Sequence, residues 1–137
     1  VLAAAPPAAF TVIDAPPGHG AITRAILVTC QLAILPVTPS PLDIWSVGET
    51  VKLVTKAKRV NKGMLDGLLI TKKIVGTRAG DEVRAALETY GRPVFKTEIC
   101  QRVAYSDAFI AGETVLDYEP SGQAAKEIRA LFKEIGK

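Results

Sequence analysis

The residues whose types and spacing suggest chemistry lie in one stretch, Phe10-Thr-Val-Ile-Asp14-Ala-Pro-Pro-Gly18. Residues that favour β structure precede Asp14, and two prolines that cannot extend a ladder follow it, before Gly18, which permits positive φ. The pattern predicts a buried strand that ends at Asp14. At the carboxyl edge of an open α/β sheet, such a carboxylate can support a magnesium ion, usually through water, beside a phosphate chain. The alternative is that Asp14 only forms the turn.

The bulk composition is that of one globular domain. The chain has 137 residues, of which 48% are hydrophobic and 23% charged. Its longest apolar stretch, residues 25–37, is interrupted by Gln31 and Pro36 and is too short to span a bilayer. The beginning of the chain lacks the basic residues of a signal peptide. We therefore expect a flexible segment over residues 1–9, a single α/β domain over 10–137, and a cytoplasmic location.

Charge and cysteine content narrow the function classes. Seventeen basic and fourteen acidic residues give a net charge of +3, a mild excess that allows nucleic-acid contact without demonstrating it. Cys30 and Cys100 lie far apart and have no partner at metal-ligand spacing. This argues against a zinc or iron–sulfur site within one chain and favours two reduced thiols in a core.

Helices and strands are expected to alternate along the chain. We predict helices over residues 21–29, 41–58, 78–90, 103–111 and 121–135, and further strands over 32–37, 64–71 and 93–97. Alternating elements with short links predict a mostly parallel, doubly wound sheet. The continuous apolar runs of the strands suit a sheet that is covered on both faces.

The sharpest helix start follows the second strand. Ser40 can serve as N-cap, Pro41 occupies the first helical position, and Asp43 completes a variant of the capping box. The expected apolar stripe of this helix consists of Leu42, Ile44, Trp45, Val47, Val51, Val54 and Ala57.

A basic cluster, Lys56, Lys58, Arg59 and Lys62, follows at the end of this helix. Positive charge suits a helix C-terminus, so a solvated helix end is one interpretation. Contact with the phosphates of a nucleic acid is the other.

Several stretches together resemble the partition ATPases of the ParA/MinD type, and most closely the ParF-like plasmid members. The most specific is Leu35-Pro-Val-Thr-Pro-Ser-Pro-Leu-Asp43, and the turn Asp14-Ala-Pro-Pro-Gly18 supports it. Further support comes from Gly67-Leu-Leu-Ile-Thr71, Gly112-Glu-Thr-Val115 and Tyr118-Glu-Pro-Ser-Gly-Gln-Ala-Ala125. The resemblance runs from about Phe10 to Ile135.

The resemblance implies a deviant P-loop fold, incomplete at its N-terminal side, that binds ATP and Mg²⁺ between two facing subunits. It assigns Asp14 to indirect support of magnesium and its water, and it makes the turn at Pro16, Pro17 and Gly18 a switch that senses the γ-phosphate. The family's nucleotide contacts would fall on Thr71, Lys72, Ile99 and Cys100. Its subunit interface would contain Pro39, Ser40, Pro41 and Asp43.

The sequence departs from the family in two places. In the loop at residues 97–102 the family often has a proline followed by an arginine, where this chain has Cys100 and Gln101. One interpretation of Arg102 is that it substitutes for the missing charge, and the other is that it is an ordinary surface residue. The implied DNA-binding set is Lys58, Arg59, Lys62 and Arg102. No glycine-rich lysine loop occurs, and Gly18-His19-Gly20 has no lysine nearby, so we expect His19 to be a solvent-exposed turn residue and these 137 residues alone not to hydrolyse ATP.

The predicted function is therefore part of a ParA-like ATPase in plasmid or chromosome partition. Such a protein would dimerise or polymerise on ATP, bind DNA without sequence preference on the nucleoid, and respond to a centromere-binding ParB- or ParG-like partner. One alternative is a non-catalytic ParA-like interaction protein. Another is MinD-like placement of the division site, although the tail at residues 126–137 has the pattern of an ordinary packed helix rather than a membrane anchor. An exposed sheet edge would favour self-association, or pairing with an upstream segment.

Overall fold

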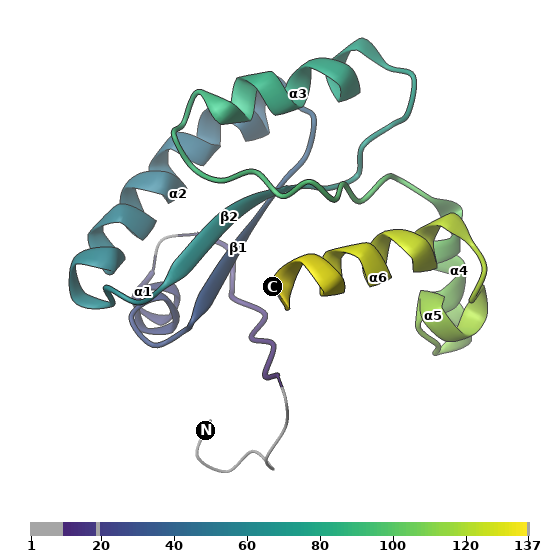
Figure 1. Ribbon diagram of the computed structural model, residues 1–137, viewed down its shortest axis with the longest axis horizontal. Coiled ribbons are helices and arrows are strands. Elements are labelled where there is room, and N and C mark those ends of the chain that lie inside the picture. Colours follow the sequence, from purple (N-terminus) through teal and green to yellow (C-terminus); the bar gives the residue numbers. More distant parts are fainter. Residues whose placement is uncertain (1–9, 19, 137) are drawn as a thin grey trace.

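The computed structural model describes residues 10–18 and 20–136, and it places helices around a small parallel sheet (Figure 1). The predicted flexible segment 1–9 and His19 lie outside the described residues. In chain order the elements are α1 (Ala21–Leu27), β1 (Leu32–Val37), α2 (Pro41–Val60), β2 (Leu65–Ile70), α3 (Arg78–Glu88), α4 (Val103–Ala111), α5 (Val115–Tyr118) and α6 (Gln123–Ile135). The helical turn α5 lies between the predicted helices 103–111 and 121–135, where the sequence predicted no helix or strand.

The sheet is parallel, as predicted, but within the described residues it has only two strands. β1 pairs with β2 in register from Leu32 opposite Leu65 to Val37 opposite Ile70. The predicted strand at 93–97 forms only an isolated bridge between Val94 and Leu68 on the other side of β2. The fold is therefore mixed α/β, and the doubly wound sheet that the sequence predicted is not seen.

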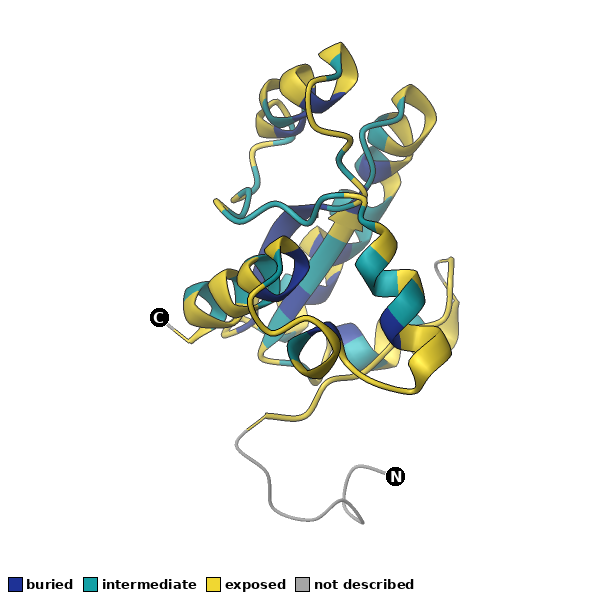
Figure 2. Cartoon of the chain, turned by 90° about the vertical axis from the view of Figure 1, so that its right-hand side faces the viewer, coloured by how far each residue is buried: buried dark blue, intermediate teal, exposed yellow. Residues whose placement is uncertain are grey.

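The prediction of an opening strand is also wrong for the structure as described. Residues 10–16 have no assigned secondary structure, and the segment 10–18 is exposed along its length (Figure 2). Val12 is 92% exposed. Phe10 makes an edge-to-face contact with Phe132, with 5.4 Å between ring centroids. An apolar run becomes a buried strand only beside a paired neighbour, and no described strand lies next to this one.

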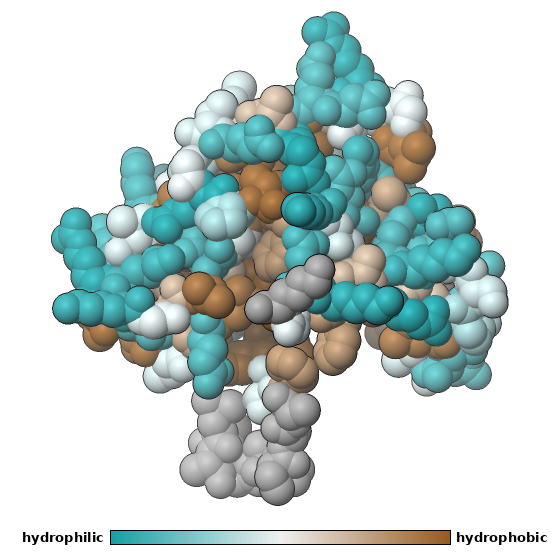
Figure 3. Space-filling model, in the orientation of Figure 1, coloured by the Kyte–Doolittle hydropathy of each residue, from teal (hydrophilic) through white to brown (hydrophobic). Residues whose placement is uncertain are grey.

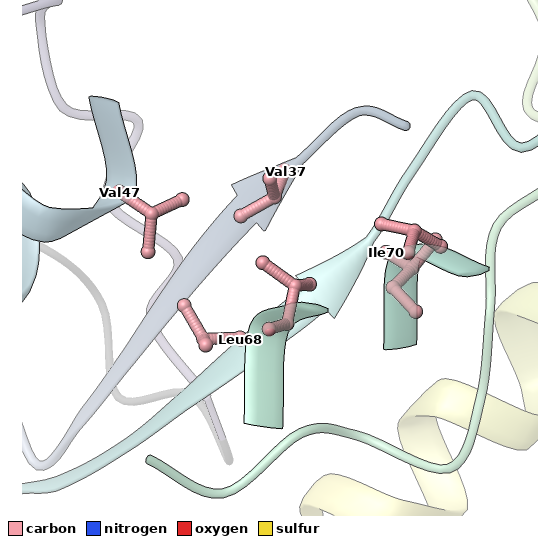
Figure 4. Packing of buried hydrophobic residues seen from close by; sticks show 6 residues of the cluster. Val37, Val47, Leu68 and Ile70 are labelled. Carbon is pink, nitrogen blue, oxygen red and sulfur yellow. The ribbon is translucent and has the colours of Figure 1, made fainter. Parts of the chain in front are cut away.

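One face of the sheet carries the main core. Val37, Leu68 and Ile70 pack there against Val47 of α2 and against α3 (Figure 4). A second cluster joins α1 and α2 to the start of the sheet. Its buried residues are Leu27, Ala33, Val54, Ala57 and Met64. A third lies among α4, α5 and α6, which Figure 1 shows together at one side of the sheet. The crossover helix α2 is thus the element that links the first two clusters.

The inward face of α2 is narrower than its sequence pattern predicted. Val47, Val54 and Ala57 are buried, whereas Leu42 and Trp45, expected in the stripe, are each 73% exposed. Both exposed residues lie in the first turns of the helix, beyond the end of β1. The first turns of α2 therefore present an apolar surface to solvent.

The outer edge of β1 is open in the described structure. The amides of Leu65 and Thr71 donate to the carbonyls of Gln31 and Val37, both at 2.8 Å. Because a parallel ladder alternates, Leu32, Ile34 and Pro36 direct their backbone groups away from β2. A groove of about 1180 Å³ lies along this strand, between segment 10–18, α1 and α2. Figure 3 shows apolar side chains exposed in the middle of this view of the molecule, among polar helix surfaces.

Candidate functional site

The structure gathers three predicted site segments at the carboxyl edge of the sheet. The Thr71 amide donates to the carbonyl of Val37 at 2.8 Å, which ties the loop after β2 to the end of β1. The Ile99 amide donates to the carbonyl of Ile70 at 2.9 Å, and the Lys73 amide donates to the carbonyl of Ile99 at 3.2 Å. The predicted nucleotide contacts at Thr71, Lys72, Ile99 and Cys100 therefore belong to adjoining loops. Carboxyl edges of parallel strands are where α/β proteins bind ligands.

Lys72 has an unusual backbone conformation for a lysine. Its φ is 51°, in the left-handed region that non-glycine residues rarely adopt, and the residue is exposed. Such conformations cost of order 1 kcal/mol and concentrate at functional sites. The loop thus presents the Lys72 ammonium group to solvent at this edge.

The predicted interface loop after β1 begins α2 as expected, but its capping differs. Ser40 has extended N-cap geometry and Pro41 is the first helical residue, yet the Ser40 side chain makes no capping hydrogen bond. Instead the Thr38 hydroxyl donates to the carboxylate of Asp43. Pro41 and Asp43 are exposed, and Pro39 and Ser40 are partly exposed. The exposed Leu42 and Trp45 adjoin this set, and the sequence analysis missed them as surface residues.

Asp14 and the predicted switch turn lie on the surface beside the groove. Asp14 is exposed, and Pro16, Pro17 and Gly18 follow it in a bend in which Gly18 has the expected positive φ of 92°. The Thr23 hydroxyl of α1 contacts the carbonyl of Pro16 at 3.4 Å. The turn chemistry is as the sequence indicated, while the strand that should hold Asp14 is not formed.

The residues present do not complete a metal site. Among the described residues, no three His, Cys, Asp or Glu side chains come together closely enough to hold a metal ion. Asp14 thus offers a single carboxylate, which suits support of a hydrated Mg²⁺ and not a closed coordination shell. No described helix is long and apolar enough to cross a membrane.

Two acidic side chains of α6, not singled out from the sequence, hold the loop that carries Cys100. Glu127 accepts hydrogen bonds from the Cys100 amide at 3.1 Å and from Arg102 Nη2 at 2.6 Å. Glu134 accepts from the Thr97 amide at 2.9 Å. Arg102, predicted to contact DNA, therefore has its charge engaged within the molecule.

The electrostatics of this loop follow from these contacts. Burial, together with the charge of Glu127, raises the pKa of the Cys100 thiol, so the thiolate is disfavoured. Burial and the same carboxylate raise the pKa of Tyr105 to about 12. Burial alone would raise the pKa of Glu134, but hydrogen bonds from Lys96 and Thr97 lower it. The loop is thus held by two carboxylates of α6 and contains a thiol whose deprotonation is disfavoured.

In the predicted basic cluster, Lys58 forms an ion pair, whereas Arg59 and Lys62 are exposed. Lys58 Nζ lies 2.5 Å from Oδ1 of Asp66, whose side chain is only 1% exposed, and Arg92 Nη1 lies 3.4 Å from the same oxygen. Arg59 and Lys62 are exposed at the end of α2. The sequence signal for the buried ion pair was a lone acid inside an apolar strand, Leu65-Asp66-Gly67-Leu68.

Comparison with known proteins gives relatives along most of the chain. The maintenance of carboxysome distribution protein A of Halothiobacillus neapolitanus is 29% identical over 128 residues, which cover 92% of this chain and 59% of that protein. The sporulation initiation inhibitor protein Soj of Bacillus subtilis is 28% identical over 130 residues, covering 92% and 51%. The chain thus spans between about half and three-fifths of the length of these relatives. No protein-family model matches it.

Proposed function

We propose that this chain supplies the part of an ATP-dependent positioning protein of the ParA/MinD type that contacts the nucleotide base and contains the γ-phosphate switch. The resemblance of its motifs to that family supports the proposal, as do relatives that match 92% of the chain at 28–29% identity. The observation that carries this proposal is the meeting of the Thr71–Lys72 loop and the 97–102 loop at the carboxyl edge of the sheet. An exposed lysine and two loop backbones at such an edge suit an adenine nucleotide. ATP and Mg²⁺ are the proposed ligands of the complete protein.

The names of the two relatives refer to the maintenance of carboxysome distribution and to the inhibition of sporulation initiation. We propose the same general role here, in which the protein moves or places a large cargo. Plasmid or chromosome DNA, bound through a centromere-binding partner protein, is the cargo that the resemblance favours. The proposed protein acts as a dimer or polymer, with the surface around Pro39, Pro41 and Asp43 between its subunits.

Photolabelling tests the nucleotide proposal directly. An azido-adenine nucleotide with Mg²⁺ should label the tryptic peptide 97–102, which is bounded by Lys96 and Arg102, and excess ATP should suppress the labelling. This measurement detects weak binding and does not require hydrolysis. Labelling spread over unrelated peptides, or labelling that ATP does not suppress, would refute a base site in this loop.

DNA binding is proposed for the exposed end of α2. Arg59 and Lys62 are exposed, whereas Lys58 forms an ion pair with Asp66. DNA affinity falls with salt, and the slope of log affinity against log salt concentration reflects the number of phosphate contacts. We expect Arg59→Ala and Lys62→Ala each to reduce this slope by about the value of one phosphate contact, and Lys58→Ala to change it less. Binding assays at several salt concentrations measure the slope. Lys133→Ala, an exposed lysine on α6, is the control, and equal slopes for all variants would remove this surface from consideration.

A further inference from the structure

The loop at residues 96–102 is bonded on its inner side to β2 and to the segment that follows it. The Phe95 amide donates to the carbonyl of Leu68 at 2.9 Å, and the Gln101 amide donates to the carbonyl of Lys73 at 2.8 Å. In an extended segment, alternate amides point the other way, and the Thr97 amide, which follows a bend at Lys96, also faces outward. On its outer side this segment has no neighbouring strand in the described structure. Its outward amides therefore need other acceptors.

Helix α6 provides those acceptors with side chains. Glu134 accepts the Lys96 amide at Oε1 (2.7 Å), and its Oε2 accepts both the amide (2.9 Å) and the hydroxyl (2.8 Å) of Thr97. Glu127 accepts the Cys100 amide at Oε2 (3.1 Å), and its Oε1 accepts Nε (3.0 Å) and Nη2 (2.6 Å) of Arg102. Hydrogen bonds to an ionised acceptor are among the stronger ones in proteins.

The spacing of the two carboxylates matches the segment that they bind. Glu127 and Glu134 are seven residues apart, which on a helix is two turns and about 10.5 Å. Thr97 and Cys100 are three residues apart, which in an extended chain is about 10 Å. The helix therefore runs beside the segment at the pitch needed to hold both of its ends.

The fully buried residues of α6 lie away from this attachment. They are Ala124 and Ala125, at its first turn, where it joins α4 and α5. Farther along, Leu131 and Ile135 are only partly buried and Phe132 is 59% exposed. In the described structure, the hydrogen bonds between α6 and residues 96–102 end on Glu127 and Glu134.

From this geometry we infer that Glu127 and Glu134 are positioning residues: α6 stands in for a missing neighbouring strand and fixes the loop that presents Ile99 and Cys100. The purpose of the fixed loop rests on the proposed function, in which it contacts the base of a nucleotide. A preorganised loop lowers the ordering cost of binding such a ligand. The ligand class is an adenine nucleotide, and the two glutamates act on it only through the loop.

Thiol labelling tests this inference, with Cys30 as an internal control. Opening of the loop in Glu134→Ala should increase alkylation of Cys100 by iodoacetamide about tenfold, while alkylation of Cys30 stays unchanged. The charges that act on the Cys100 thiol are those of Glu127, Arg102 and Lys73. Glu134→Ala therefore reports opening without a change of the neighbouring charge, and Glu127→Gln tests the second contact.

Hydrogen exchange and nucleotide labelling complete the test. The amides of Lys96 and Thr97 should exchange faster in Glu134→Ala, and the Cys100 amide in Glu127→Gln, but none should change in the control Glu88→Gln on α3. Wild-type exchange and wild-type alkylation in both glutamate variants would overturn the inference. If the variants open the loop and azido-adenine labelling of peptide 97–102 falls severalfold, both proposals are supported. If the loop opens but the wild type is never labelled, the nucleotide proposal fails and the positioning role of the glutamates stands.

Discussion

Among individual residues, carboxylates with long-range partners determine much of the structure around the site. Asp66 lies inside β2 and meets Lys58 from α2 and Arg92 from the loop after α3. Its second oxygen, Oδ2, is buried without a hydrogen-bond partner. The sequence predicted that Lys58 belongs to a basic cluster that is either a solvated helix end or a nucleic-acid contact. It did not predict the ion pair with Asp66, because a pair eight residues apart on two different elements leaves no local pattern.

Replacing Asp66 with Asn should destabilise the protein by about 1–3 kcal/mol, because it leaves two cations beside β2 without their counter-charge. The lower half of that range is favoured because Lys58 keeps a third of its side chain in water (33%). The midpoint of urea unfolding measures the change. The control Asp107→Asn, on α4, should change the free energy of unfolding by less than about 0.5 kcal/mol. A wild-type midpoint for Asp66→Asn would show that the ion pair adds nothing.

Glu98 should make stability depend on pH. Desolvation alone would raise the pKa of Glu98, but hydrogen bonds from Lys73 and Arg84 lower it below its usual value of 4.5. A carboxylate with a lowered folded-state pKa stabilises the protein above the unfolded-state value, and this stabilisation is lost as the pH falls through the folded-state value. Unfolding measured from pH 7 to pH 3 should thus show a weaker pH dependence in Glu98→Gln. Glu82→Gln, at an exposed i,i+4 pair with Arg78, should retain the wild-type dependence.

Among the elements, those fixed by local patterns were predictable. The strand at 32–37 and the helix at 103–111 have their predicted bounds, and Gly112 ends that helix with a φ of 71°. The strand at 93–97 failed because the amides of Lys96 and Thr97 bond to Glu134 rather than to a ladder. The opening strand failed because its ladder partner is not among the described residues. Periodicity predicts the type of an element, whereas pairing depends on which neighbour is present.

Gly67 tests the contact between β2 and the segment beside it. A Cβ added at Gly67 would lie 2.7 Å from the Phe95 ring, so the ring would have to move. We expect Gly67→Ala to cost about 1–3 kcal/mol in unfolding free energy. Gly63→Ala is the matched control, since a Cβ there meets nothing within 4 Å. If both variants unfold alike, Phe95 moves freely and the segment is not packed on β2.

For the whole molecule, the open edge of β1 and the exposed groove beside it are the dominant features. β1 carries no charged residue, and charged residues are a common protection of exposed edges. The chain spans between about half and three-fifths of the length of its relatives, and the sheet in its described part has an unpaired edge at β1. The sequence indicated the parallel topology but overestimated its extent, since the number of strands depends on all the chains that pair.

This open edge predicts self-association that depends on β1. The apparent mass from sedimentation should rise with protein concentration, and Ile34→Lys should suppress the rise, because a charge along the groove opposes strand pairing. Ser106→Lys, which adds the same charge on the exposed surface of α4, controls for net charge. A monomer at all concentrations, or equal association of both variants, would exclude β1 as the contact.

Pro36 gives this edge a direction. Proline has no amide hydrogen, and the backbone nitrogen of Pro36 faces the open side of β1, so this position offers no hydrogen-bond donor there. An arriving chain can exchange hydrogen bonds with Leu32 and Ile34 in both senses, but beside Pro36 it meets an acceptor only. Pairing with a further chain would therefore be stronger at the start of β1 than near its carboxyl end.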